Sequence, residues 1–456
     1  MFHRLLLAAG LAVVLASPAR AASPDEIAAL RAEFERKFQS LQTDYEARLK
    51  AFESRVQTAE IKADNAQQEA AASTSPPVAA NALNPEISLI LQGAYIDRAG
   101  GERPITGFMP AGGHADNGRG FTLNETELVL GANVDPYSRG LLILAVTDDE
   151  VEVEEAWFQT LRLDHGLTVK GGRFRSGIGY QNEKHPHARD FADNSLMYSA
   201  LFGEALNQDG LQLRWLAPTE LFLELGAEVA KGQFFPGSDV GADKNGADAW
   251  AAFAHVGGDV GVAHSWRAGV SYLRASPRER EAFLDDINDF EALTAFSGRS
   301  KTWLADFVWK WAPDGNPRQR NVIFAAEYFD RNEDGDLACQ DDVLAGGACL
   351  GLTDRYASAQ SGGYVQAIYQ FMPRWRTGLR YDRLDGGSVD FGTNGAFFEA
   401  VDFDPSRWSL MTDYSPSEFS RFRLQFARDK SFQDDPDNQV ILQYILSIGA
   451  HGAHKF

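Results

Sequence analysis

The feature that most constrains the fold is a strict alternation of short and long connections between segments of two-residue hydrophobic period. In one such segment Trp375, Leu379 and Tyr381 lie on one parity, and Arg376 and Arg380 lie on the other. Successive side chains of a β-strand point to opposite faces, so the strand has an apolar and a charged face. A soluble sandwich and a membrane barrel both use such strands. In a barrel the apolar face meets lipid and the polar face lines the lumen.

The connections decide between these two architectures. We predict sixteen strands, near 86–97, 121–134, 139–148, 150–163, 166–178, 208–217, 221–231, 248–257, 264–274, 301–312, 320–331, 363–372, 375–385, 407–414, 419–429 and 438–448. Short turns, such as 135–138 and 415–418, alternate with long connections, most clearly 180–206, 232–247, 276–300, 332–361 and 386–406. An up-and-down barrel sorts its connections in this way, with turns at one end and loops at the other. The sequence therefore predicts an all-β membrane protein, with an antiparallel transmembrane β-barrel of about 16 strands over residues 86–456.

The extreme N-terminus has the pattern of a secretory signal peptide at 1–21. Arg4 precedes an apolar core at 5–16 that is too short to cross a bilayer as a helix, and small residues flank a cut after Ala21. Cleavage removes Arg4 and Arg20, so the net charge of −21 becomes −23. Export also permits a disulfide between Cys339 and Cys349, and two free thiols are the alternative.

Residues 22–63 are predicted to form a periplasmic helical coiled coil. Ser23 and Pro24 provide an N-cap and an N1 proline, and apolar or small residues then recur at spacings of three and four from Ile27 to Ala63. An isolated helix with this stripe needs a partner surface, so we expect self-association, with a single helix lying on the barrel mouth as the alternative. Residues 64–85, poor in bulky apolar side chains, are predicted to be a flexible linker.

Composition and motifs exclude several function classes. The chain has 64 acidic and 43 basic residues, which argues against a nucleic-acid partner because binding phosphates needs a basic surface. Beyond the signal peptide there is no run of 18 apolar residues, which argues against a helical membrane protein. The sequence contains no GxSxG, P-loop or HExxH motif, so we do not expect an enzyme.

Charged residues on the inward parity are predicted to line the pore, with the arginines largely on the last strands. This candidate set is Arg214, Arg267, Arg376, Arg380, Arg421, Arg423, Glu224, Glu228, Asp306 and Asp382. Opposed charges across a pore create a transverse field that sets ion preference. We expect a water-filled pore with arginines on one wall. The alternative is that these charges only keep the interior wet.

Three further features are candidates for sites. The stretch 330–341 matches much of a calcium-loop spacing, with possible ligands Asp330, Asn332, Asp334, Asp336 and Asp341, and an acidic surface loop is the alternative. Two histidine pairs, His185 with His187 and His451 with His454, could ligate zinc, but the spacing identifies no third ligand. The loop 180–206 carries charges and aromatic residues, which makes it the candidate for an inward constriction loop.

The signal peptide, the coiled segment, the barrel and the terminal Phe456 together resemble Gram-negative outer-membrane porins, and the coiled segment is similar to the phosphate-selective porin O/P type. The resemblance implies a barrel of sixteen strands that forms a homotrimer, an inward-folded loop, and recognition of Phe456 by the barrel-insertion machinery. Phosphate-selective members line the constriction with basic residues, whereas this mature chain is strongly acidic.

The expected function is an outer-membrane porin, a water-filled channel for diffusion of small hydrophilic solutes or ions. The alternative is a substrate-specific or energy-coupled receptor, with metal ions as the candidate substrate. Energy-coupled barrels have 22 strands and an internal plug, and residues 86–456 would leave little loop at that number. The expected location is the bacterial outer membrane, with the N-terminal segment in the periplasm.

Overall fold

The structure is a computed structural model of the 456-residue chain. It describes residues 35–37, 39, 43, 86–99, 105–108, 118–147, 150–240, 245–433 and 436–449. The chain divides into two units, 1–81 and 82–456. In the first unit the described residues are helical, and the Thr43 hydroxyl donates to the Gln39 carbonyl at 2.8 Å. The predicted signal peptide, most of the coiled coil, the linker, His451, His454 and Phe456 lie outside the described residues.

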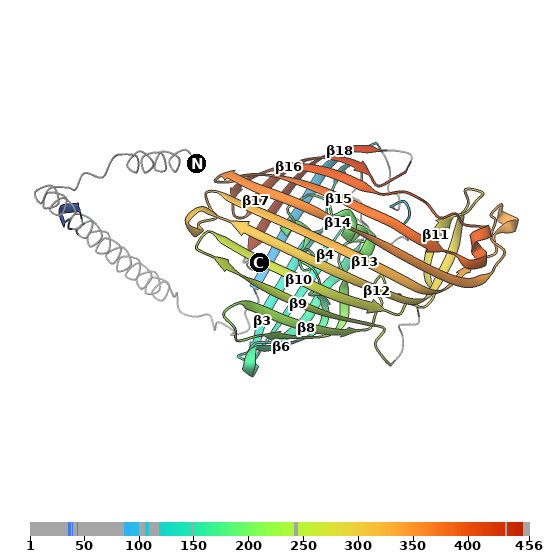
Figure 1. The fold of residues 1–456 in the computed structure, drawn as a ribbon, viewed down its shortest axis with the longest axis horizontal. Helices are drawn as coiled ribbons and strands as arrows, with labels where there is room; N and C mark the ends of the chain where they lie inside the picture. Colours follow the sequence, from blue (N-terminus) through green and yellow to red (C-terminus); the bar gives the residue numbers. More distant parts are fainter. Residues whose placement is uncertain are drawn as a thin grey trace, which may run out of the picture. The chain divides into compact units, whose positions relative to one another are not determined.

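The second unit is built almost entirely from antiparallel strands (Figure 1). The strands are β1 Glu86–Asp97, β2 Gly120–Thr122, β3 Thr126–Asp135, β4 Ser138–Val146, β5 Val151–Thr160, β6 Leu167–Arg175, β7 Asn207–Leu216, β8 Phe222–Ala230, β9 Ala249–Val260, β10 His264–Ala275, β11 Arg280–Asp285, β12 Glu291–Trp311, β13 Asn321–Cys339, β14 Thr353–Met372, β15 Trp375–Asp390, β16 Ser406–Ser417, β17 Ser420–Lys430 and β18 Asp437–Gly449. The helical turns are η1 Asp164–Gly166, η2 Pro186–Ala188, α3 Leu196–Phe202, η3 Pro313–Gly315, η4 Val343–Ala345 and η5 Gly392–Ala396.

Sixteen of these strands close into a barrel. From β3 to β10 and from β12 to β18 each strand pairs with the next, β10 pairs with β12, and β1 closes the ring by pairing with both β18 and β3. The two short strands β2 and β11 only extend the pairing of β1 and β12. All sixteen predicted strands are present. Among the described residues, no helix is both long and apolar enough to cross a membrane.

The two ends of the barrel differ as the sequence predicts. Tight turns such as 136–137, 373–374 and 418–419 lie at one end, and the longer connections 176–206, 231–248 and 391–405 lie at the other. Strands β12 to β15 are longer than predicted and continue beyond the other strands, together with β11 (Figure 1). Part of the predicted loops 276–300 and 332–361 is therefore strand.

The outer face of the barrel is apolar and carries rows of aromatic rings. Trp375, Tyr414, Phe422 and Tyr444 lie opposite one another in register across β15 to β18. The next position in this row is Gly93 of β1, where a Cβ would lie 2.7 Å from the Tyr444 ring. Rings at such levels are typical of the interface between lipid and water.

The stretch 330–341, considered as a calcium loop or an acidic surface loop, is mostly strand, because residues 330–339 belong to β13. Asp330, Asn332, Asp334 and Asp336 alternate with buried residues on the exposed face of this strand. In an extended strand, next-but-one residues are about 6.6–6.8 Å apart, so their side chains cannot wrap one ion. The register instead places Asp334 opposite Arg299. Asp341 follows the end of the strand.

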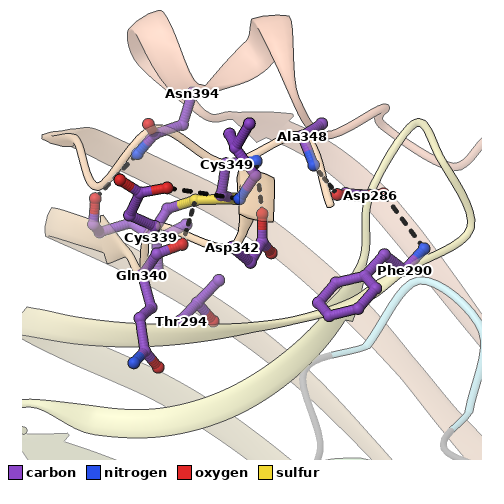
Figure 2. Close-up of a disulfide and its surroundings, with 12 residues drawn as sticks. Asp286, Phe290, Thr294, Cys339, Gln340, Asp342, Ala348, Cys349 and Asn394 are labelled. Carbon is purple, nitrogen blue, oxygen red and sulfur yellow. Dashed lines mark hydrogen bonds between the residues drawn. A yellow bond between two sulfur atoms is a disulfide. The ribbon is translucent and has the colours of Figure 1, made fainter. Parts of the chain in front are cut away.

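The predicted disulfide is present and lies at the far end of this extension (Figure 2). Cys339 ends β13 and Cys349 lies in the following loop, with 6.0 Å between their Cα atoms. Both are buried with Phe397 and Phe398 in a small apolar cluster. The Asp342 carboxylate accepts from the Cys349 amide at 2.9 Å, which orders the linked loop.

Candidate functional site

The lumen is crossed by the connection between β6 and β7, residues 176–206, which we call the inward loop. Its helix α3 begins at the N-cap Ser195, which accepts from the Tyr198 amide, and ends at Gly203, whose φ is +76°. Leu196, Met197 and Tyr198 are buried against inward apolar side chains of the wall, among them Phe253, Leu273, Leu304, Phe329, Tyr364 and Leu384. The loop predicted at 180–206 therefore folds inside the barrel and not outside it.

Arginines of one wall hold the acidic part of the inward loop. The Arg380 guanidinium lies 2.8 Å from Asp193 and 2.8 Å from Asp382 of its own strand. Arg376 lies 2.8 Å from Asp190. Arg423 donates to the Arg189 carbonyl at 3.0 Å. These three arginines of β15 and β17 therefore anchor the loop, whereas Arg214 and Arg267 lie on the distant strands β7 and β10.

Carboxylates of β13, two strands from β15, and of β8, across the barrel, hold the remainder of the inward loop. Glu327 of β13 accepts from the amides of Tyr180 and Gln181 at 2.8 and 3.0 Å and from the Tyr198 hydroxyl at 3.0 Å. Glu228 of β8 accepts from the Ser176 hydroxyl at 2.5 Å and from the Gly177 amide at 2.8 Å. The inward loop is thus bonded to several strands around the barrel, and it narrows the lumen.

The ten residues predicted to line the pore all lie on the inner face, and most contact the inward loop. Beyond those already placed, Arg214 binds Glu183 at 2.7 Å, and Arg267 donates to the Gly179 carbonyl at 3.0 Å. The Asp382 carboxylate accepts from the Leu196 amide at 3.0 Å, and Arg421 lies near the His187 carbonyl at 3.5 Å. The two others lie beside these arginines, with Glu224 3.5 Å from Arg214 and Asp306 3.0 Å from Arg267.

A cavity of about 920 Å³ lies between the inward loop and the strand ends that carry the short turns. Its lining includes Arg139, Lys170, Arg267 and Lys310, together with several glutamates. Trp157 lines this cavity and donates to Glu155 at 2.8 Å. The lining is therefore of mixed charge, as a polar lumen requires.

One group of side chains in the cavity wall combines histidines and carboxylates. His185 of the inward loop places Nδ1 3.0 Å from Glu154 Oε2 and 3.4 Å from Glu127 Oε2. Its Nε2 lies 2.9 Å from Glu155 Oε1. His187 Nδ1 lies 2.6 Å from Glu127 Oε1. We call these five residues the glutamate–histidine cluster.

A β-bulge explains why two consecutive glutamates of β5 belong to this cluster. Ile143 of β4 lies opposite Glu155 and Leu144 lies opposite Val153, so Glu154 has no partner in register. Both Glu154 and Glu155 are buried. A bulge inserts one residue and re-aims side chains, which brings both carboxylates to the lumen side. Without the bulge, one of the two side chains would point to the outer, lipid-facing side of the barrel.

Burial and neighbouring charges perturb the ionisation of groups near the inward loop. Burial, with the nearby carboxylates of Glu204 and Glu127, raises the pKa of Glu125 to about 8. Burial lowers the pKa of His187 against the opposing effect of Glu127. Burial would raise the pKa of Asp193, but Arg380 and Arg407 outweigh it and lower this pKa to about 2. Asp193 is therefore ionised at neutral pH and can hold both arginines.

Sequence reasoning paired His185 with His187 but found no third ligand. The missing carboxylates come from β3 and β5, about 30 to 60 residues upstream. No spacing rule connects them to the histidines. The one local signal was the Glu154–Glu155 doublet inside a segment of alternating period.

Comparisons with known proteins extend this description. The barrel resembles three solved structures: the loop-deleted OmpT outer membrane protein of Vibrio cholerae (11% identity, 81% of this chain and 100% of that chain, TM-score 0.49), OprB of Pseudomonas putida (13%, 80% and 94%, TM-score 0.48) and the outer membrane channel DcaP of Acinetobacter baumannii (14%, 80% and 97%, TM-score 0.46). Because these TM-scores are below 0.5, the fold assignment here rests on the strand pairing of this chain.

The sequence comparison identifies a nearer relative. No family model matches the chain. A protein of Aquifex aeolicus (strain VF5), described as an uncharacterized protein, is 32% identical over 404 residues, which are 83% of this chain and 81% of the relative. At this identity and coverage, the chain belongs to the same family as the Aquifex aeolicus protein.

Proposed function

We propose that the protein is a porin of the bacterial outer membrane, a channel for diffusion of small hydrophilic solutes or ions. The observation that carries the proposal is a closed barrel of sixteen strands with an apolar outer face and a charged inner face that encloses a cavity of about 920 Å³. An apolar exterior is stable only against lipid, and a charged interior is stable only with water or counter-charges.

The inward loop sets the expected properties of this channel. Its bonds to arginines of β15 and β17 and to glutamates of β8 and β13 hold it across the lumen, so we expect low conductance and a low size limit for solutes. The ion pairs between the inward loop and the wall neutralise much of the positive charge of the arginines. Selectivity then depends on charges that remain accessible, among them Arg139 of the cavity lining and Arg421 of β17, with side chains 32% and 29% exposed.

We further propose a homotrimer with its N-terminal segment in the periplasm. The support for self-association is the apolar stripe of residues 22–63 together with the exposed apolar outer face of the barrel. One solved structure similar to this chain is described as a trimer form of OmpT from Vibrio cholerae. The terminal Phe456 remains the proposed signal for the insertion machinery. Native mass spectrometry in detergent tests the oligomer, and a monomer would contradict it.

The alternative reading, an energy-coupled receptor, is less well supported. Plugged transporters of the outer membrane have 22 strands, whereas sixteen strands close this barrel. The element that narrows the lumen is an internal loop between β6 and β7.

Liposome swelling tests the proposed function. The protein is reconstituted into lipid vesicles, and swelling rates are recorded in iso-osmotic solutions of sugars or amino acids of increasing size. Faster entry of the smallest solutes, with a sharp fall as size increases, supports a narrow diffusion channel. A barrel that inserts with its β-sheet signal intact but leaves the permeability of the vesicles unchanged would overturn the proposal.

A further inference from the structure

We propose that the glutamate–histidine cluster is a binding site for one divalent transition-metal ion of the zinc or manganese type. The ion would be held by His185 Nδ1, Glu127 Oε2 and Glu154 Oε2. One ligand atom from each of these three residues lies within 4.8 Å of the other two. The inference concerns this site alone and does not depend on whether solutes pass through the barrel.

The carboxylates around His185 favour a positive charge at this site. Both ring nitrogens face carboxylate oxygens, with Nε2 2.9 Å from Glu155 and Nδ1 3.0 Å from Glu154. A neutral imidazole carries only one N–H, so one of these contacts would place two lone pairs against each other. A metal ion bound to one ring nitrogen removes this conflict, because it takes the lone pair of the ring and of the carboxylate together.

The distances favour the metal on the Nδ1 side. Oxygen and nitrogen ligands lie about 2.0–2.2 Å from zinc in tetrahedral geometry, which places neighbouring ligands about 3.3–3.6 Å apart. The two separations from His185 Nδ1 are 3.0 Å to Glu154 Oε2 and 3.4 Å to Glu127 Oε2. An ion can therefore fit between these atoms with little movement of the side chains.

An unsatisfied buried oxygen supplies independent support. Glu127 is 1% exposed, and its Oε2 atom has no hydrogen-bond partner in the described part of the chain. A buried carboxylate oxygen without a partner is unfavourable. This oxygen is one of the three proposed ligand atoms, so a metal ion would satisfy it.

The next layer of contacts has the arrangement that metal sites use. With the metal on Nδ1, Nε2–H of His185 donates to Glu155, which fixes the tautomer and the ring orientation. His187 bonds the other oxygen of Glu127 at 2.6 Å, and Arg175 bonds the other oxygen of Glu154. Each proposed ligand is thereby oriented by a neighbour that does not itself bind the ion.

The types of ligand atom indicate which ion binds, and the position of the cluster in the cavity wall indicates how the ion enters. An imidazole with two carboxylates suits zinc, manganese or cobalt, whereas calcium and magnesium prefer oxygen ligands alone. Two of the three proposed ligands, Glu127 and His185, line the cavity, so an ion in the cavity can reach the site. A bound ion would tie the inward loop to β3 and β5.

Metal titration of the detergent-purified, untagged full-length mature protein tests the proposal. After treatment with a chelator, Zn²⁺ binding is followed by isothermal titration calorimetry and Co²⁺ binding by its visible spectrum. One ion per chain is expected. His185→Gln and Glu127→Gln should abolish this binding, and Glu155→Gln should weaken it by about 10–100-fold because it orients the ligand.

Two control variants separate this site from other histidines. His255→Gln changes a buried histidine that lies 3.1 Å from Glu224 on another part of the wall, and it should keep wild-type affinity. A variant with His451→Gln and His454→Gln should also keep it. The β-sheet circular dichroism signal shows which variants are folded. The proposal is overturned if the folded wild type binds no ion, if folded His185→Gln binds normally, or if only the C-terminal variant loses binding.

Discussion

Arg380 of β15 and Asp193 of the inward loop form an ion pair of 2.8 Å inside the barrel, where Arg380 is only 1% exposed. Asp193 also lies 3.2 Å from Arg407 and accepts from Gln425 at 2.7 Å. Three strands of one wall therefore converge on a single loop carboxylate. Breaking a buried pair by removing one partner is strongly destabilising, at about 3–5 kcal/mol. This contact is the main attachment of the inward loop to the arginine wall.

Charge reversal at Arg421 should alter ion selectivity. Arg421 is the most exposed of the wall arginines and lies 3.9 Å from Asp413. The variant Arg421→Glu should shift the reversal potential in a salt gradient toward cation preference, because a positive charge becomes negative in the lumen. Arg383→Glu is the matched control, since Arg383 pairs with Asp404 on the surface. Equal shifts in both variants would show that Arg421 does not face the ion path.

The ion pairs that Asp193 forms with Arg380 and Arg407 should persist in mildly acidic solution. The pKa of this carboxyl lies at about 2, below its ordinary 3.8, so its stabilising contribution is fully present above about pH 4. The contribution is lost as the pH falls from about 4 through 2, because protonation removes the charge that holds Arg380 and Arg407. Conductance measured at pH 7, 5 and 3 should be unchanged between the first two values and should begin to rise at the third. A rise already at pH 5 would assign the attachment to other groups.

The disulfide should stabilise the extended tip and leave the channel unaffected. It closes a loop of ten residues, for which chain entropy predicts about 3 kcal/mol of local stabilisation. The double variant Cys339→Ser, Cys349→Ser should be cleaved faster by added protease within residues 340–352, with conductance as in the wild type. If a folded variant loses conductance, the disulfide-linked tip lies in the path of ions, and the prediction is wrong.

The strands could be predicted because the pattern that specifies each strand lies within its own short stretch of sequence. In β17, Phe422, Leu424 and Phe426 alternate with arginines, and the turn before it contains Pro416. The extra length of β12 to β15 could not be predicted in the same way. Above the lipid the outer face becomes charged, as at Arg299 and Asp334, so the alternation of apolar and polar residues ends although the strand pairing continues.

The candidate site was only partly predictable, because contacts between residues far apart in the sequence leave no local pattern. The parity rule placed Arg380 and Asp382 inside, but no local signal shows that the loop residues Asp193 and Leu196 contact them. Glu327 and the inward loop meet across about 130–150 residues of sequence. Such contacts follow from the closure of the barrel, which brings distant strands around one loop.

Single-channel recording of wild type and Arg380→Ala shows whether the barrel conducts ions and whether the inward loop limits the current. The wild type should give small, discrete conductance steps. Clearly larger steps are expected for Arg380→Ala, because the inward loop loses its main attachment, while Arg383→Ala should behave as the wild type. Identical steps in wild type and folded Arg380→Ala, or no steps from a folded and inserted barrel, would contradict the account.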